Sequence, residues 1–147
     1  MGTTVRTILD AKGHTVHTVG PDAALDEAVT TLRRNRIGAL VVTDPQGHVA
    51  GMLSERDVIR ILADRGPECL TTTVADVMTT QVTTCALDDT IDTVMATMTS
   101  GRFRHVPVVA DGELVGIVSI GDAVKSRMDQ LELEKDQLAS YVTGSSY

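Results

Sequence analysis

Aromatic residues are scarce in this chain of 147 residues, which contains one phenylalanine, two tyrosines and no tryptophan. Its hydrophobic content is nevertheless 42%, so the core must be built from aliphatic side chains and methionine. Proteins that bind single-stranded nucleic acid without sequence preference stack the bases on aromatic side chains. The composition therefore argues against that class of protein.

Positive charge is also in short supply, with 13 Lys and Arg against 20 Asp and Glu and a formal net charge of −7. Binding to a nucleic acid backbone requires a basic surface, so we expect no nucleic acid partner. No apolar run approaches the ~18 residues that span a bilayer, and residues 1–10 lack the apolar segment of a signal peptide. We expect a cytoplasmic protein with no membrane partner.

Cysteine is rare, and Cys69 and Cys85 have neither metal-binding nor redox spacing, so free buried thiols are expected. The histidines at positions 14, 17 and 48 are scattered and do not suggest convergent metal ligands. No histidine is placed to activate a serine nucleophile. We expect neither a metal nor a catalytic site, and the chain is not expected to be an enzyme.

The chain does contain a duplication. Residues 51–57 (GMLSERD) and 116–122 (GIVSIGD) both begin with a glycine, which is followed by a serine three positions later and an aspartate six positions later. The two segments are 65 positions apart (116 − 51). The same glycine, serine and aspartate positions, repeated at a fixed spacing, indicate a duplicated supersecondary unit.

Each copy has the same expected order of elements, which is a short helical turn, a strand, a helix, two strands joined by a tight turn, and a second helix. Acidic residues at the start of the first full helix suit the positive end of its dipole. In the second copy Pro107 has no N–H and cannot donate a hydrogen bond to a neighbouring strand. We therefore expect its strand at a place in the sheet where the N–H of residue 107 needs no partner. The expected ranges are 4–9, 15–19, 22–32, 37–42, 49–53 and 55–64 in the first copy and 73–78, 81–85, 88–98, 106–109, 114–118 and 120 onward in the second.

Residues 74–78 (VADVM), residues 104–109 (RHVPVV) and the two Gly-x-x-Ser-x-x-Asp segments resemble a tandem pair of cystathionine-beta-synthase (CBS) domains, also called a Bateman module. The resemblance extends over residues 4–127. It implies an α/β fold in which two β-α-β-β-α repeats, related by a pseudo-twofold axis, pack their small sheets together. We divide the chain into a first repeat (1–68), a second repeat (69–127) and a C-terminal helical extension whose end frays (128–147).

Such modules bind adenosine-containing ligands in clefts between their repeats and usually act as regulatory sensors. The Ser-x-x-Asp pairs, Ser54 with Asp57 and Ser119 with Asp122, match capping boxes and could serve only to cap helices. The same helix N-termini could also hold a phosphate, while the carboxylate accepts hydrogen bonds from ribose hydroxyls. We predict both roles at once.

Basic residues surround the ends of the first full helices. For Arg33 and Arg34 we favour interaction with the helix dipole, whereas Arg104 and His105 are candidates for phosphate contacts. The first copy has Gly38 and Ala39 at the matching positions, so one cleft should be basic and the other small and neutral. By resemblance, Ser54 and Asp57 would be joined by Val82, Thr84, Arg104 and His105, and Ser119 and Asp122 by Val16, Thr18, Gly38 and Ala39.

The last helix is longer than its counterpart and has an apolar stripe at 124, 128, 131, 138 and 142, interrupted by Lys135. It could lie on its own domain or pack on a second subunit. We expect a homodimer that the C-terminal helices reinforce.

The expected function is the sensing of an adenosine nucleotide, AMP, ADP, ATP or NAD, with an effector protein as the readout. No catalytic cofactor is expected. A module for protein interaction or dimerisation, without a small ligand, is the main alternative, and an enzyme is a weaker one. Which nucleotide binds, and whether both clefts fill, is left open by the residues.

Overall fold

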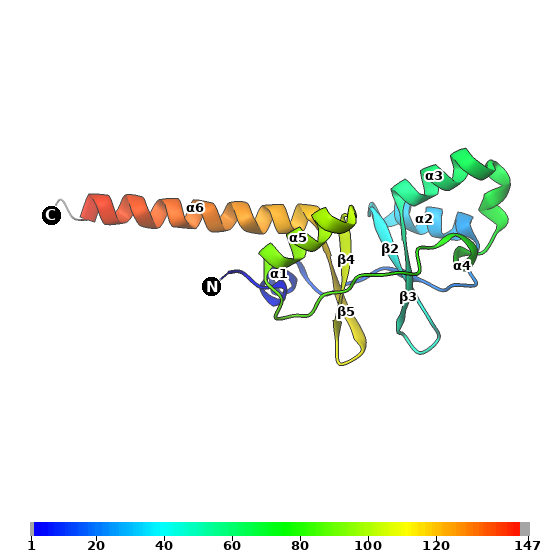
Figure 1. Ribbon diagram of the computed structural model, residues 1–147, viewed down its shortest axis with the longest axis horizontal. Helices are drawn as coiled ribbons and strands as arrows, with labels where there is room; N and C mark the ends of the chain where they lie inside the picture. Colours follow the sequence, from blue (N-terminus) through cyan, green and yellow to red (C-terminus); the bar gives the residue numbers. More distant parts are fainter. Residues whose placement is uncertain (1, 145–147) are drawn as a thin grey trace.

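The computed structural model describes residues 2–144 of the chain as an α/β body from which one long helix projects (Figure 1). The predicted fold class is confirmed, with two small sheets and a C-terminal helix. The end predicted to fray, 144–147, is helical at Gly144 and otherwise lies outside the described residues.

The first repeat has a three-stranded sheet in the order β1-β2-β3. The short strand β1 (Thr18–Val19) pairs in parallel with β2 (Ala39–Thr43), which pairs antiparallel with β3 (Val49–Ser54). Helix α2 (Leu25–Asn35) joins β1 to β2, and α3 (Glu55–Arg65) follows β3. Helix α3 ends at Arg65, and the Gly66 that follows it has φ 80°.

The second repeat has the same order with one strand missing. Helix α5 (Ile91–Gly101) leads into β4 (His105–Ala110), which pairs antiparallel with β5 (Glu113–Ser119), and α6 (Ile120–Gly144) follows. The connection between β4 and β5 is a two-residue turn in which both Asp111 (φ 52°) and Gly112 (φ 78°) have the positive φ that such hairpins require.

The strand predicted over 81–85 is wrong, because only Cys85 forms a bridge, parallel to Val108. In the first repeat the N–H of Val41 donates to the carbonyl of His17 at 3.4 Å. The residues at the corresponding positions are Pro107 and Thr83, and proline has no N–H to donate. The parallel pairing therefore stops at Cys85, and the preceding residues follow an irregular path.

The two hydrophobic cores exchange one segment each. Helix α1 (Val5–Lys12) buries Val5, Ile8 and Leu9 in the core of the second repeat. In return the 3-10 helix η1 (Pro67–Thr71) and helix α4 (Val74–Val77) bury Cys69 and Val74 in the core of the first. The boundary proposed at 68/69 thus separates the sequence repeats, but each core contains residues from both sides of it.

Matching hydrogen bonds hold the two exchanged segments. The N–H of Val5 donates to the carbonyl of Asp89 at 2.9 Å, and the N–H of Val74 donates to the carbonyl of Ala23 at 2.8 Å. Thr4 and Thr73 stand at the N-cap positions of α1 and α4, but neither side chain forms the capping hydrogen bond. Backbone pairing therefore fixes these helices in place of side-chain caps.

Two glycines make room for the exchanged segments. A Cβ on Gly51 would lie 2.5 Å from Sδ of Met78, and a Cβ on Gly116 would lie 2.6 Å from Cδ1 of Leu9. Only glycine allows such close approach of side chains to a strand. The glycine that recurs at this position in both copies thus serves packing between the repeats.

Candidate functional site

Two capping boxes of nearly identical geometry begin α3 and α6. The N–H of Asp57 donates to Ser54 Oγ at 3.2 Å, and the N–H of Ser54 donates to Asp57 Oδ2 at 2.9 Å. The corresponding distances for Ser119 and Asp122 are 3.1 and 2.9 Å. The capping role predicted for both pairs is present, and each serine also lies at the end of a strand, at a helix N-terminus that attracts anions.

The residues next to each capping box come from the adjacent strand. Ala39 pairs with Ser54 across β2 and β3, and His105 pairs with Ser119 across β4 and β5. The Cβ that Gly38 lacks would lie 3.2 Å from Cε1 of His105, so β2 and β4 approach each other here. The start of β4 therefore contacts the first repeat close to its capping box.

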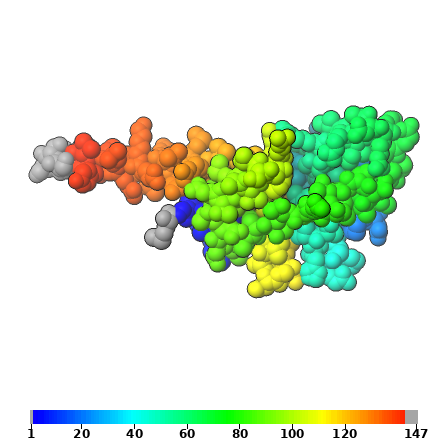
Figure 2. All heavy atoms as spheres, viewed as in Figure 1, coloured from blue at the N-terminus to red at the C-terminus, as the bar shows by residue number. Residues whose placement is uncertain are grey.

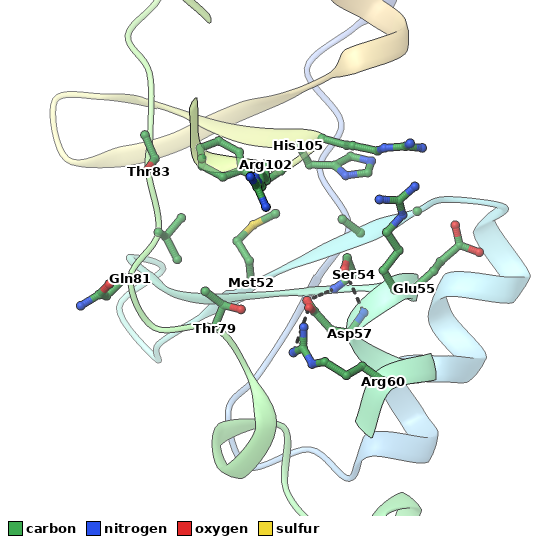
Figure 3. Close-up of a pocket in the computed structure, with 17 residues that line it drawn as sticks. Met52, Ser54, Glu55, Asp57, Arg60, Thr79, Gln81, Thr83, Arg102 and His105 are labelled. Carbon is green, nitrogen blue, oxygen red and sulfur yellow. Dashed lines mark hydrogen bonds and ion pairs between the residues drawn. The ribbon is translucent and has the colours of Figure 1, made fainter. Parts of the chain in front are cut away.

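A cavity of about 790 Å³ lies between the repeats at this point. In Figure 3, Arg102 and His105 face Ser54 and Asp57 across it. Its volume lies within the range of pockets for cofactors and other small ligands. Its lining consists of Gly38, Ala39, Met52, Ser54, Glu55, Arg56, Asp57, Arg60, Thr79, Gln81, Val82, Thr83, Gly101, Arg102, Phe103, Arg104 and His105.

Five of the six residues predicted for the first cleft line this cavity. They are Ser54, Asp57, Val82, Arg104 and His105. Thr84 is not among the lining residues, and its neighbour Thr83 takes the place because the segment is irregular rather than a strand. Gly38 and Ala39, which were assigned to the other cleft, also line this one.

The cavity is basic although the protein is acidic. Four arginines, at positions 56, 60, 102 and 104, line it together with only two carboxylates, at Glu55 and Asp57. One carboxylate already has a partner, because Arg60 lies 3.2 Å from Asp57 Oδ1. The surplus of positive charge suits an anionic ligand, and guanidinium groups can bind phosphate in a bidentate manner.

The cavity also has an apolar part. Met52, Val82 and Phe103, the only phenylalanine of the chain, contribute to its lining. Such side chains can enclose a flat heteroaromatic ring, while the arginines hold an anionic group. The lining therefore combines the two chemistries that an adenine nucleotide would need.

His105 is half-buried in this basic surrounding. Burial is the main cause that lowers its pKa, and the charges of Lys12 and Arg104 lower it further, whereas Asp122 and Glu55 act in the opposite direction. The resulting pKa of His105 lies below its usual value, so the neutral imidazole is favoured near pH 7. The ring can then accept a hydrogen bond or take up a proton when an anion arrives.

The second predicted cleft has a different geometry. Nζ of Lys12 donates to Asp122 Oδ2 at 2.6 Å and to the carbonyl of Ile117 at 2.8 Å. Partial burial raises the pKa of Asp122, but hydrogen bonds from Lys12 and Ser119 outweigh it and hold the pKa below its usual value. The carboxylate that was to bind ribose therefore already has a cationic partner.

A smaller cavity of about 300 Å³ lies beside Lys12 and Asp122, between α1 and α6. Ser119, Val16, Thr18, Gly38 and Ala39 do not line this cavity, so their grouping with Asp122 stays a prediction.

Arg60 and Arg102 were not predicted as site residues. Arg60 follows Asp57 by three positions on α3, a spacing that places two side chains on one helix face. Arg102 ends α5 in the left-handed conformation, with φ 58°, and its counterpart Arg36 has φ 53°. The helical spacing could have identified Arg60, whereas the backbone conformation of Arg102 has no signal in the sequence.

Among residues 2–144, no group of three or more His, Cys, Asp and Glu side chains could hold a metal ion. In the same range no helix is long and apolar enough to cross a membrane.

A model of the CBS domain family matches residues 6–64 and 74–129. The CBS domain-containing protein CBSX3, mitochondrial, of Arabidopsis thaliana is 34% identical over 127 residues, which cover 84% of this chain and 62% of that protein. This chain thus spans less than two thirds of that relative.

Two solved structures show the same arrangement. The CBS-domain containing protein ATU1752 from Agrobacterium tumefaciens is 49% identical, with a TM-score of 0.83 over 86% of this chain and 95% of that one. The CBS domain pair of protein MJ0100, in complex with 5-methylthioadenosine and S-adenosyl-L-methionine, is 27% identical, with a TM-score of 0.79 over 88% and 99%.

Proposed function

This chain belongs to the CBS domain family, and we propose that it is a sensor that binds an adenosine nucleotide in the basic cavity beside Ser54 and Asp57. The observation that carries the proposal is the composition of this cavity. Arginines at positions 56, 60, 102 and 104 surround a capped helix N-terminus and lie next to an apolar surface. The adenosine compounds bound by MJ0100 support the choice of an adenosine ligand.

In this proposal each group of the ligand has a place. The phosphates contact Arg104, the N-terminus of α3 and the hydroxyl of Ser54, since these groups supply positive charge and donors. The ribose hydroxyls donate to the carboxylate of Asp57. The adenine ring lies against Met52, Val82 and Phe103. AMP, ADP, ATP and NAD are the candidate ligands.

Ligand binding would bridge the repeats, because Asp57 belongs to the first and His105 to the second. A ligand shifts an equilibrium between two arrangements only if it binds one of them more tightly. A nucleotide that bridges the repeats meets that condition, because it can contact Asp57 and His105 together only when the two repeats lie close to each other. The readout is then a change that an effector protein or a second copy of the chain detects.

The experiment is a thermal-shift panel with AMP, ADP, ATP, NAD and S-adenosylmethionine on the wild type, Asp57→Asn and Asp122→Asn. Binding at 100 times Kd adds about 2.7 kcal/mol to the free energy of unfolding. We expect at least one nucleotide to stabilise the wild type and Asp122→Asn but not Asp57→Asn. Both variants lose an equivalent capping carboxylate, so the difference between them reports the ligand.

A second experiment tests the phosphate contacts. Replacing Arg104 by Gln should weaken ATP more than adenosine, by roughly ten- to a hundredfold for a lost charge-assisted hydrogen bond. Arg65→Gln is the matched control, because Arg65 lies at the other end of α3 and pairs with Asp76 at 2.8 Å outside the cavity. Equal losses for ATP and adenosine would contradict the assignment of Arg104.

An interaction module without a small ligand is the second candidate, and the exposed apolar side chains of α6 favour it. Such a module predicts no stabilisation by any nucleotide of the panel. For location we propose the cytoplasm, because Cys69 and Cys85 are free and buried and form no disulfide framework.

A further inference from the structure

The outer part of α6 carries apolar side chains that the rest of the chain does not cover. Figures 1 and 2 show this helix projecting from the body. Every side chain from Leu131 to Val142 is exposed. The exposed fractions are 64% for Met128, 52% for Leu131 and 64% for Leu138. Exposed apolar surface of this extent marks an interaction site.

These side chains follow a heptad pattern. Positions 124, 128, 131, 135, 138 and 142 are separated by alternating steps of four and three residues. Five of them are Val, Met or Leu, and the sixth is Lys135. Alternating steps of this kind form the contact line of a left-handed two-stranded coiled coil.

The body does not block this line. Helix α6 contacts the body through its first turns, where Ala123 is fully buried and Arg127 lies 3.4 Å from Asp92. At about 100° per residue, the apolar line lies roughly a third of a turn away from that face. A second helix can therefore reach it from the side.

We propose that α6 pairs with α6 of a second copy of this chain as a parallel two-stranded coiled coil. Charge complementarity selects the occupant and its direction. In a parallel pair, Arg127 at position g faces Glu132 at position e of the other helix, twice per dimer. In an antiparallel pair centred on Leu131 to Lys135, the carboxylates of Glu132 and Glu134 from both helices come together and repel each other.

Lys135 specifies the register of this pair. A single lysine among the apolar core positions lowers the stability of a coiled coil but selects one alignment and one oligomeric state. In the parallel alignment each Lys135 can reach Glu134 of the other helix. A shift by one heptad would bury the ammonium group against Met128 or Val142 of the partner.

The pair is weak on its own, because fewer than three full heptads contribute and isolated short helices are marginal in water. It therefore assembles at high local concentration and adds to any other contact between the bodies. The inference does not depend on nucleotide binding, so failure of one proposal leaves the other standing.

The first experiment is sedimentation equilibrium on the full chain with Leu131→Asp and Leu133→Asp. The two leucines are similarly exposed, at 52% and 58%, but they are two positions apart and so point in nearly opposite directions from the helix axis. We expect a concentration-dependent dimer for the wild type and Leu133→Asp, and a Kd at least tenfold weaker for Leu131→Asp. A monomeric wild type, or equal effects of both substitutions, overturns the proposal.

The second experiment tests direction. Leu138→Cys should cross-link to itself under oxidation, because identical core positions face each other in a parallel pair, whereas Leu133→Cys should not. The native cysteines do not interfere, since Cys69 and Cys85 are 2% and 8% exposed. Cross-linking of Leu138→Cys only with a second cysteine at position 128 would show an antiparallel pair and overturn this proposal.

The third experiment tests the charges and the register. Arg127→Glu and Glu132→Arg should each weaken the dimer severalfold, and the double exchange should restore it. Lys135→Leu should tighten the dimer at least tenfold and allow larger oligomers. A double exchange without recovery, or weaker association of Lys135→Leu, contradicts the assigned alignment.

Discussion

Lys12 and Asp122 are joined by an ion pair of 2.6 Å that links the exchanged helix α1 to the N-terminus of α6. The corresponding carboxylate in the first repeat, Asp57, pairs with Arg60 of its own helix at 3.2 Å. The duplication has thus produced two capping boxes with different cationic partners. One partner comes from the same helix, and the other comes from the far end of the chain.

This difference predicts unequal nucleotide sites. In the second site the Lys12 ammonium competes with ribose hydroxyls for Asp122, so the wild type should bind a second nucleotide at least tenfold more weakly than the first. Lys12→Met should tighten the weaker site severalfold, as expected for loss of an ion pair of about 1 kcal/mol. Isothermal titration calorimetry checks this.

Lys125→Met is the control, because Lys125 lines the same small cavity without the hydrogen bond to Asp122. Weaker binding at the second site in Lys12→Met would show that Lys12 contacts the nucleotide, contrary to the prediction.

Substitution of the two serines should distinguish an effect on the stability of the fold from an effect on nucleotide binding. Ser54→Ala and Ser119→Ala each remove an equivalent N-cap hydrogen bond, so both should lower the free energy of unfolding by about 1 kcal/mol. Only Ser54→Ala should also weaken nucleotide binding at the tighter site. Urea denaturation measures the first effect and calorimetry the second, and equal affinities in the two variants would remove Ser54 from the site.

The affinity for an anionic nucleotide should rise as the pH falls from 8 to 6. Burial lowers the pKa of His105 in the free protein, and a bound phosphate would raise it, so binding is coupled to proton uptake. Titrations of the wild type and His105→Gln with the same nucleotide remove the contribution of the ligand's own titration. Parallel pH dependences in the two proteins would show that His105 does not take up the proton.

Cys85 should resist thiol reagents in the native state. Burial and the charge of Asp89 raise its pKa to about 12, so the reactive thiolate is rare at pH 8. A colorimetric thiol assay should detect the two cysteines only after denaturation. Rapid reaction of native protein, which disappears in Cys85→Ser, would contradict the burial of this side chain.

The sequence predicted the repeat, the fold class and most helix and strand positions, because apolar periodicity and turn residues are local signals. It predicted the residues that line the cavity around Ser54 less completely. Arg60 reaches the cavity because it lies one helical turn after Asp57, and Arg102 reaches it because its backbone is left-handed. The pairing of Lys12 with Asp122 joins residues 110 positions apart. No local pattern in the sequence encodes such a contact, so the cationic partner of Asp122 was not predicted.

The irregular path of residues 81–84 has a similar origin. The sequence identified Pro107 as a residue that cannot complete a ladder, but the consequence falls on the segment opposite, not on the proline. Gln81, Val82 and Thr83 are released from the sheet and line the cavity. One missing N–H thus distinguishes the two otherwise similar repeats.

The crossing of α1 and α4 between the two cores makes the halves mutually dependent for folding. A fragment ending at residue 68 would lack Cys69 and Val74, and a fragment beginning there would lack Val5, Ile8 and Leu9. Each fragment alone would leave a hole in its interior, while a mixture of the two could rebuild the whole. Because both repeats are on one polypeptide, the exchange of α1 and α4 is intramolecular. Two separate chains would have to associate in solution to make the same exchange.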